Sequence, residues 1–377
     1  MRVYFDNNAT TPTDPRISEI MSEIMTTQFG NPASTSHAWG WQAEELVNIA
    51  NENIAGLLGC DPNSFIFTSG ATESINLALL GLRGLKPKRI CFSTIEHKAV
   101  LDVALELEKL GFEAVKINVD QQGLLDLEQL KSELQKPTAI FSLIAANNEI
   151  GTIQDLKKIS EICKECHTFL HLDITQLLGK ENFKLSDYSV DLASFSGHKI
   201  YGPKGVGALY ASQRIRDELL PIIFGGGHQR GLRSGTLNVP GIVGLGKACE
   251  ILTKEGSEVI RHISKLTKIA AEGLQTSVSK ISINGSQKHR IAGNLNLRVP
   301  GLNASTLLSK LSNEIALSSS SACLSQTGSN SHVLEAIGLN KAERNSSFRI
   351  SIGRFNTEEE TVWAVNKISK EIFSLIK

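Results

Sequence analysis

Short apolar runs alternate with amphipathic stretches from about residue 60 to residue 210, and this alternation constrains the fold more than any other feature. Strands that alternate with helices form a mainly parallel sheet with helices on both faces. The runs that predict strands are Phe65–Thr68, Ile90–Thr94, Ala114–Val119, Ala139–Leu143, Phe169–Leu172, Leu192–Phe195 and Val206–Tyr210. The stretches that predict helices are Glu73–Leu82, Ala99–Leu110, Leu127–Leu134 and Leu156–Glu165. Because the last run closely follows the one before it, we expect one strand to run against the others.

The C-terminal part of the chain has a different pattern, which predicts a smaller α+β domain. A long helical pattern extends from near Glu255 to about Gln275. A capping box, Thr357 with Glu360, predicts the start of the last helix. Shorter runs between these helices predict strands at Ile281–Ile283, Asn294–Arg298 and Phe348–Ile352.

Composition excludes several classes of protein. Basic and acidic residues number 39 each, so no net field favours nucleic acid or an anionic membrane as a partner. No apolar run reaches the roughly 18 residues that span a bilayer. The first twelve residues lack the basic flank and apolar core of a secretory signal. We therefore expect a cytoplasmic protein.

The six cysteines are sparse for a chain of 377 residues, which predicts free thiols in a reducing compartment. Cys163 and Cys166 form a C-x-x-C pair that would suit a redox or metal site. They lie inside a helical pattern, however, and no second pair exists elsewhere in the sequence. We therefore assign no metal site.

Polar side chains follow most of the predicted strands, where open α/β sheets bind their ligands. The turn Ser69–Ser74 opens a helix whose N-terminus suits a phosphate, although ordinary N-capping also explains it. Any one of these residues alone is more often structural, but their joint placement at successive strand ends predicts a site. Besides that turn, the polar residues at or just after the strand ends are Glu96, His97, Asn147, Asn148, Glu149, Asp173, Gln176, Ser196, His198 and Lys199.

This set meets the requirements of pyridoxal phosphate (PLP). A lysine amine forms a Schiff base with the aldehyde, and a carboxylate keeps the pyridine nitrogen protonated. Amide donors suit the ring oxygen, an imidazole suits the ring face, and hydroxyls at a helix N-terminus suit the phosphate. Motifs for nucleotide phosphates, dinucleotides, zinc proteases and serine hydrolases are absent from the sequence.

Nearly the whole chain resembles the cysteine desulfurases of NifS/IscS type, PLP enzymes of the class V aminotransferase group. The motifs that carry the resemblance are Asp6–Pro12, Gly30–Ser34, Thr68–Ser74, Glu96–Val100, Asn147–Gly151, Ser194–Gly205, Gly225–Gly231, Arg233–Thr236 and Ser321–Cys323. The resemblance implies the aspartate aminotransferase-like fold (fold type I), with a mainly parallel seven-stranded sheet. It also implies a large PLP-binding domain over residues 14–255 and a small domain of residues 1–13 and 256–377.

The resemblance also implies a role for each matching residue. Lys199 is the Schiff-base lysine, Asp173 pairs with the pyridine nitrogen, and His97 stacks on the ring. Arg349 grips the substrate carboxylate, with Asn148 beside it, although a structural salt bridge is the alternative role for Arg349. The remaining cofactor contacts are Ala71, Thr72, Asn148, Gln176, Ser196 and His198, and Thr236 completes the phosphate site of the neighbouring subunit. The expected assembly is thus a homodimer.

Cys323 decides the expected chemistry. It lies in a Ser/Gly-rich segment, Ser318–Ser331, that predicts a mobile loop. A free cysteine is often a small buried hydrophobe, but the polar surroundings argue against burial here. The resemblance makes Cys323 the nucleophile that takes sulfur from L-cysteine, leaving alanine and a persulfide. The loop is of the longer NifS/IscS form, and Cys323 could also ligate an iron–sulfur cluster transiently.

Three departures from the family pattern leave questions open. Ile174 replaces a small residue, Ser320 replaces a glycine in the catalytic loop, and the chain ends at Lys377 without a longer tail that some members use to dock a scaffold. The sulfur acceptor is therefore open between an iron–sulfur scaffold and a tRNA-thiolation protein. The alternatives for the activity are a selenocysteine lyase, another class V aminotransferase or a non-catalytic scaffold.

Overall fold

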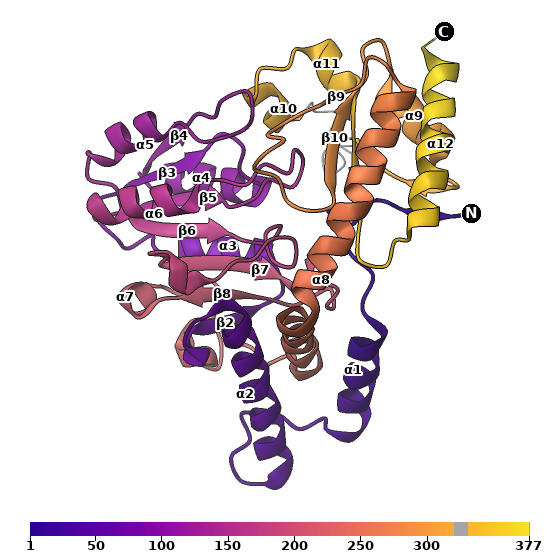
Figure 1. Cartoon of the computed structure of the whole chain (residues 1–377). Coiled ribbons are helices and arrows are strands. Elements are labelled where there is room, and N and C mark those ends of the chain that lie inside the picture. The colour runs from indigo at the N-terminus through magenta and orange to yellow at the C-terminus, as the bar shows by residue number, and fades with distance from the viewer. Residues whose placement is uncertain (320–330, 377) are drawn as a thin grey trace.

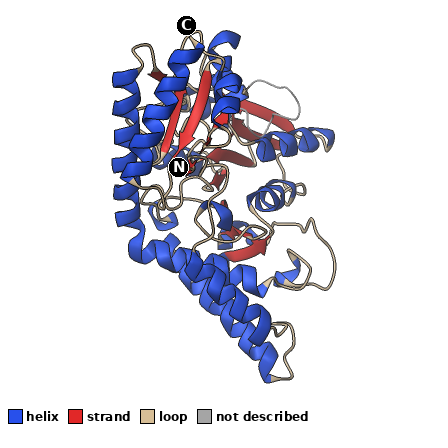
Figure 2. Ribbon diagram, turned by 90° about the vertical axis from the view of Figure 1, so that its right-hand side faces the viewer, coloured by secondary structure: helices blue, strands red, loops and turns tan. Residues whose placement is uncertain are grey.

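The computed structural model describes residues 1–319 and 331–376. Its body is a sheet flanked by helices, and a second lobe beside it carries both chain termini (Figure 1). Helices α1 (Pro15–Thr27) and α2 (Ala38–Leu58) extend away from this body, and Figure 2 shows the same extension from the side. Most of the predicted mobile loop, including Ser320 and Cys323, lies outside the described residues.

The main sheet confirms the predicted fold class. Its strands are β2 (Phe65–Thr68), β3 (Arg89–Ser93), β4 (Glu113–Ile117), β5 (Ile140–Ile144), β6 (Phe169–Asp173), β7 (Leu192–Ser196) and β8 (Gly207–Ala211). They form a seven-stranded sheet in the order β2-β8-β7-β6-β5-β3-β4. Strand β8 is antiparallel to both β2 and β7, and the other pairs are parallel. One strand therefore runs against the others, as expected.

Helices cover both faces of this sheet because alternate strand residues point to opposite sides. Phe141 packs in a core with side chains of α2, α5, α6 and α8, whereas Ile140 packs in a second core with α3, α4 and α7. The helices are α3 (Ala71–Leu80), α4 (Lys98–Lys109), α5 (Leu127–Leu134), α6 (Leu156–Glu165), α7 (Gln213–Arg216) and α8 (Val239–Ser277). Each strand's carboxyl end thus lies between two helical layers.

The second lobe has its own apolar core, which includes Phe5 and Phe348. Its antiparallel sheet has the order β12-β13-β10-β9, and a short parallel pair joins β1 to β11. The strands are β1 (Val3–Tyr4), β9 (Ser282–Ile283), β10 (Asn294–Arg298), β11 (Ile315–Ala316), β12 (Ser318–Ser319) and β13 (Ser347–Ser351). The helices are α9 (Ala304–Leu311), α10 (His332–Ala336), α11 (Lys341–Asn345) and α12 (Glu358–Leu375), and the capping box that precedes α12 is confirmed.

The structure differs from the sequence-based prediction most clearly in helix α8. This helix begins at Val239, well before the expected start near Glu255. Its first turns are buried on nearly every side, from Val239 to Leu252, so they lack the polar face that an amphipathic pattern requires. Helix α2, which the sequence analysis did not predict, packs against α8.

Candidate active site

The predicted cofactor residues gather around the carboxyl edge of the main sheet, where β5, β6 and β7 end. Asp173 is the last residue of β6, and Ser196 is the last residue of β7. His97 is the N-cap of α4, after β3. Parallel neighbours end on the same side of a sheet, which brings these side chains to one edge.

Lys199 lies on a 3-10 turn that directly follows β7. Its Nζ donates hydrogen bonds to the backbone carbonyls of Asn8 and Ala9, each at 2.6 Å. The Thr11 backbone N–H donates to the His198 carbonyl at 2.9 Å. The N-terminal segment of the chain therefore crosses this edge and orients the amine.

Asp173 is 4% exposed and accepts a hydrogen bond from the Thr175 backbone N–H at 2.9 Å. The Nδ1 of His97 accepts from the Ala99 backbone N–H at 3.1 Å, so the proton of a neutral ring is on Nε2. Burial lowers the pKa of His97, and the nearby charge of Asp173 opposes that shift. His97 is therefore a neutral imidazole beside a carboxylate.

Glu96, next to His97 in the chain, is fully buried. Its Oε1 accepts from the Ser93 hydroxyl at 2.5 Å and from the Ile144 backbone N–H at 2.7 Å. Its Oε2 has no hydrogen-bond partner within the described chain. Burial raises the pKa of Glu96 to about 8, so this carboxyl is mostly protonated at neutral pH. In the sequence, Glu96 stands out only as a polar residue at a strand end, without a role of its own.

The N-terminus of α3 has no side-chain cap within the described residues, a feature that it shares with the short α7, whereas α4, α5 and α6 are each capped by a side chain. Gly70, its N-cap, has φ 155°, a value that favours glycine. A side chain at residue 207 would place its Cβ 2.7 Å from the Cα of Gly70, so the turn approaches β8 only because Gly207 has no side chain. The backbone N–H groups of Ala71 and Thr72 in this first turn are therefore not satisfied by a side-chain cap.

Two side chains complete the set of groups that suit a phosphate. A Cβ on Gly70 would lie 3.5 Å from the Ser196 hydroxyl, so this hydroxyl is beside the start of α3. The Nδ1 of His198 lies 3.1 Å from the Thr10 hydroxyl, and burial together with Lys199 lowers the pKa of His198 to about 4. With the lysine and the carboxylate, these groups fit PLP.

Arg349, on β13, connects the second lobe to the carboxyl edge. Its Nη1 donates to the Asn148 carbonyl at 2.8 Å, and its Nη2 lies 2.8 Å from Asp6 Oδ1 and 3.0 Å from the Ser318 hydroxyl. The salt bridge that the sequence left open therefore exists, with Asp6. The Arg349 Nε has no partner within the described residues.

The ends of the segment that contains Cys323 are anchored at the same edge. Ser318 donates to Asp6 at 2.5 Å, and Ser331 donates to Glu149 at 2.6 Å. Burial raises the pKa of Glu149 to about 7. Cys323 itself lies outside the described residues. Thr236 is exposed, and within the described chain it forms no hydrogen bond to the other predicted site residues.

Sequence reasoning missed Lys180, a second lysine at this edge. It is 7% exposed, and its Nζ donates to Asn8 Oδ1 at 2.8 Å and to Gln176 Oε1. The only sequence signal was a lysine directly after the apolar run that contains Leu177 and Leu178. Ile174, a departure from the family pattern, is fully buried in the main core.

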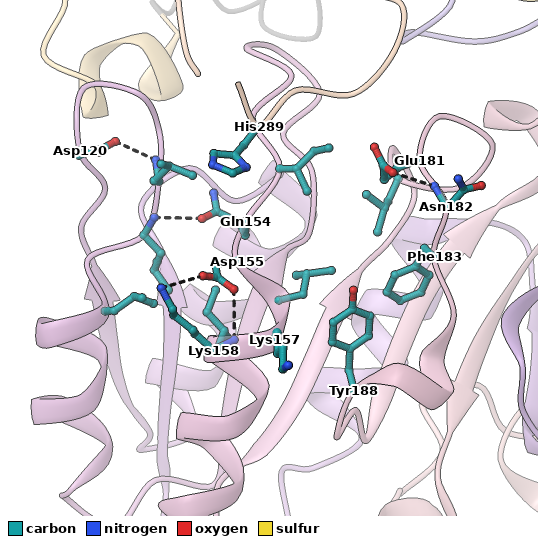
Figure 3. Close-up of a pocket in the computed structure, with 17 residues that line it drawn as sticks. Asp120, Gln154, Asp155, Lys157, Lys158, Glu181, Asn182, Phe183, Tyr188 and His289 are labelled. Atoms are coloured by element: carbon teal, nitrogen blue, oxygen red, sulfur yellow. Dashed lines mark hydrogen bonds and ion pairs between the residues drawn. The ribbon is translucent and has the colours of Figure 1, made fainter. Parts of the chain in front are cut away.

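A cavity of about 640 Å³ lies apart from these residues, between the β4–α5 connection and the start of α6 (Figure 3). None of the predicted site residues lines it. Two of its acidic and amide side chains pair within the chain: Asp155 caps α6 and pairs with Lys158, and Gln154 bonds to backbone groups of Gly123 and Leu125. The chemistry therefore does not coincide with this cavity.

Other findings bear on the excluded classes. The five cysteines within the described residues are free thiols, and Cys163 is buried with a raised pKa. In the described part of the chain no three His, Cys, Asp or Glu side chains group as metal ligands. No helix in residues 1–319 and 331–376 combines the length and apolarity needed to cross a membrane.

Comparisons with known proteins agree with this geometry. The family model described as aminotransferase class-V matches residues 3–362. The cysteine desulfurase IscS of Mannheimia succiniciproducens is 44% identical over 99% of this chain and 93% of its own. The structure of a NifS-like protein superposes with a TM-score of 0.92, at 39% identity and full coverage of both chains. The structure of SspA in complex with cysteine has a TM-score of 0.82 at 32% identity and covers 95% of this chain and all of its own. The chain therefore belongs to the class V aminotransferases, a PLP-dependent family, and within them to the cysteine desulfurases.

Proposed function

We propose that this chain binds PLP through Lys199 and transfers the sulfur of L-cysteine to Cys323, leaving L-alanine. The observation that carries the proposal is the meeting of an amine, a buried carboxylate and an uncapped helix start at one sheet edge. When bound, PLP supplies an aldehyde for amines and a cationic ring that withdraws electrons from the substrate Cα. The protein's own residues do the rest.

Each cofactor group has a matching residue. Lys199 would hold the aldehyde, Asp173 would keep the ring nitrogen protonated, and His97 would stack on the ring. Asn148 and Gln176 would donate to the ring oxygen. Ala71, Thr72, Ser196 and His198 would bind the phosphate, at the start of α3 that no side chain of the described residues caps.

Arg349 binds the substrate carboxylate. Its guanidinium has an unpaired Nε within the described chain, and Asn148 lies beside it. A planar guanidinium suits a carboxylate because it donates two parallel hydrogen bonds. The related protein SspA was solved with cysteine, which supports cysteine as the substrate here.

With PLP and substrate bound, the amine of Lys199 would take the Cα proton. The Cys323 thiolate then attacks the substrate sulfur. An S–S bond forms, the substrate C–S bond breaks, and its electron pair stays on the carbon, which takes a proton to become the methyl group of alanine. The anchored positions of Ser318 and Ser331 support this role, because they keep both ends of the cysteine segment at the site.

The active assembly is a homodimer in which Thr236 contributes to the phosphate site of the neighbouring subunit. Its exposure in one chain supports this, because a residue that serves a partner must be free at the surface. Large apolar side chains are also exposed on and beside helices α1 and α2, and in the segment that precedes Thr236 in the sequence. A contact with a second copy of the chain would cover them. They are Phe29 (68%), Trp39 (57%), Trp41 (56%) and Phe224 (76%).

The persulfide then passes to a sulfur-acceptor protein in the cytoplasm. An iron–sulfur scaffold and a tRNA-thiolation protein both use this chemistry. Co-purification of the tagged chain from its own host identifies which acceptor binds.

Two variants separate the roles of the amine and the thiol. Lys199→Ala removes the visible absorbance that PLP gives the wild type and abolishes alanine formation. Cys323→Ser keeps that absorbance but forms no protein persulfide, measured by mass spectrometry after incubation with L-cysteine. Sulfide release by Cys323→Ser at the wild-type rate, with a thiol reductant present, contradicts the assignment of the nucleophile.

A further inference from the structure

Lys180 is a buried lysine with no acidic partner in the part of the chain that the structure describes. Its two hydrogen-bond partners are neutral side-chain oxygens, Asn8 Oδ1 and Gln176 Oε1. Burial lowers the pKa of Lys180 well below its ordinary value, and the positive charges of Lys199 and Arg349 add to this shift. Because a buried lysine without an anion is unfavourable for stability, its presence calls for a reason other than stability.

The hydrogen bonds of Lys180 lead directly to Lys199. The Gln176 Nε2 donates to the Asn8 carbonyl at 2.9 Å, and the Lys199 Nζ donates to the same carbonyl at 2.6 Å. Lys180 also holds the Asn8 side chain. Asn8 and Gln176 therefore connect the two lysines. Both accept a hydrogen bond from Lys180, Gln176 donates to the Asn8 carbonyl, and Lys199 donates to that same carbonyl.

The positions of Lys180 and of the Asn8 carbonyl together set which way the Gln176 amide faces. Its Oε1 accepts from the Lys180 amine, and its Nε2 donates to the Asn8 carbonyl. A rotated amide would place its oxygen against the Asn8 carbonyl, where two acceptors cannot form a hydrogen bond. Without Lys180, only the Asn8 carbonyl would favour this orientation.

We propose that Lys180 is a positioning residue that holds Gln176 with its Nε2 toward the cofactor ring oxygen. The inference rests on the proposed function, in which Gln176 donates to that oxygen. Lys180 does not touch the reacting atoms in this account. It acts through Gln176, so its effects must disappear when Gln176 can no longer donate.

A double-mutant cycle on the PLP-loaded protein tests this coupling. The variants are Lys180→Met, Gln176→Leu and the double variant, with Lys157→Met, an exposed lysine at the cavity of Figure 3, as the matched control. The readouts are the affinity for PLP and the pH midpoint of its visible absorbance in the protein. A lost donor to the ring oxygen makes that oxygen and the neighbouring nitrogen more basic, so the midpoint rises.

We expect Lys180→Met and Gln176→Leu each to raise the midpoint by about one pH unit and to weaken PLP binding about tenfold, the effect of one lost hydrogen bond. The double variant should match Gln176→Leu alone, and Lys157→Met should match the wild type. Lys180→Gln, which keeps a shorter donor, should fall between the wild type and Lys180→Met. It also serves as the second variant should the methionine chain fail to fold, as judged by circular dichroism.

Two outcomes overturn the inference in distinguishable ways. If Gln176→Leu shifts the midpoint but both Lys180 variants leave it at the wild-type value, or if the shifts add in the double variant, Lys180 does not act through Gln176 and the proposed function stands. If Gln176→Leu itself has no effect on either readout, the proposed role of Gln176 is wrong and the inference falls with it.

Discussion

Helices α3 and α6 both begin after strands of the main sheet, yet their first turns are built in opposite ways. No side chain in the described part of the chain caps α3, and Gly207 lets its start approach β8. Asp155 caps α6 and pairs with Lys158 at the rim of a cavity of about 640 Å³. The cavity therefore lies beside α6, whose first turn is capped, and the predicted site residues lie beside α3, whose first turn is not.

Polar groups without partners therefore locate the site better than the volume of a cavity does. Around α3 and the neighbouring strand ends, Glu96 and Lys180 are buried with no opposite charge bonded to them among the residues that the structure describes. Around α6, Asp155 pairs with Lys158 and Gln154 bonds to backbone groups (Figure 3). A protein maintains unfavourable burial mainly where function requires it.

Asp173, at the carboxyl edge of the main sheet, gives the strongest test of this difference between the two regions. We expect Asp173→Ala to lower kcat/KM about 10³-fold or more, because the ring nitrogen loses the charge that keeps it protonated. Steady-state alanine formation measures this. Activity within a factor of three of the wild type would mean that this edge does not hold the cofactor ring.

The pH dependence of the free energy of unfolding tests the buried carboxyl of Glu96 at the same edge. A carboxyl whose pKa is raised in the folded state contributes stability that is fully present below its ordinary pKa and is lost as the pH rises through the folded pKa. For Glu96 the ordinary pKa is about 4.5 and the folded pKa about 8, so this stability is lost between those two pH values. Glu96→Gln removes this dependence. Urea unfolding at pH 5 and pH 9 should show wild-type stability falling by on the order of 3 kcal/mol more than that of the variant, because each pKa unit is worth about 1.4 kcal/mol. Equal losses would show that Glu96 ionises normally.

Arg349 tests the substrate side of the same edge. Arg349→Lys keeps the charge but loses the planar fork, so we expect kcat/KM for L-cysteine to fall about 50-fold, mainly through KM. The visible absorbance of bound PLP should remain, which separates substrate binding from cofactor loss. An unchanged KM would leave Arg349 with only its ion pair to Asp6.

The smallest effect is expected at the satisfied helix. Asp155→Ala removes the cap of α6 and should lower the free energy of unfolding by about 1 kcal/mol, while alanine formation stays at the wild-type rate. Denaturant unfolding and the activity assay together measure this. A large loss of activity in a stably folded variant would give the cavity a function that its paired groups do not suggest.

Local patterns were enough to predict the main sheet and its reversed strand. Alternation of apolar runs and helices is a property of neighbouring residues, and polar residues at strand ends meet wherever a parallel sheet forms. The same rule brought His97, Asp173 and Lys199 to one edge. The roles of the individual residues came from the family resemblance.

Features set by contacts between distant segments could not be predicted. The first turns of α8 are buried all round by neighbours such as α2, so no amphipathic pattern marks their start. Lys180 was missed because its partner Asn8 lies far away in the sequence. The Oε2 of Glu96, which has no hydrogen-bond partner among the described residues, is likewise visible only once the surrounding chain is in place.

The central claim is that Lys199, and not its buried neighbour Lys180, carries the cofactor. Reduction of the PLP-loaded protein with borohydride fixes the cofactor on the lysine that holds it, and peptide mass spectrometry identifies that lysine. The account predicts the added mass on the peptide that contains Lys199, with none on Lys180. Added mass on Lys180, or on neither of them in a protein that retains its visible absorbance, would contradict it.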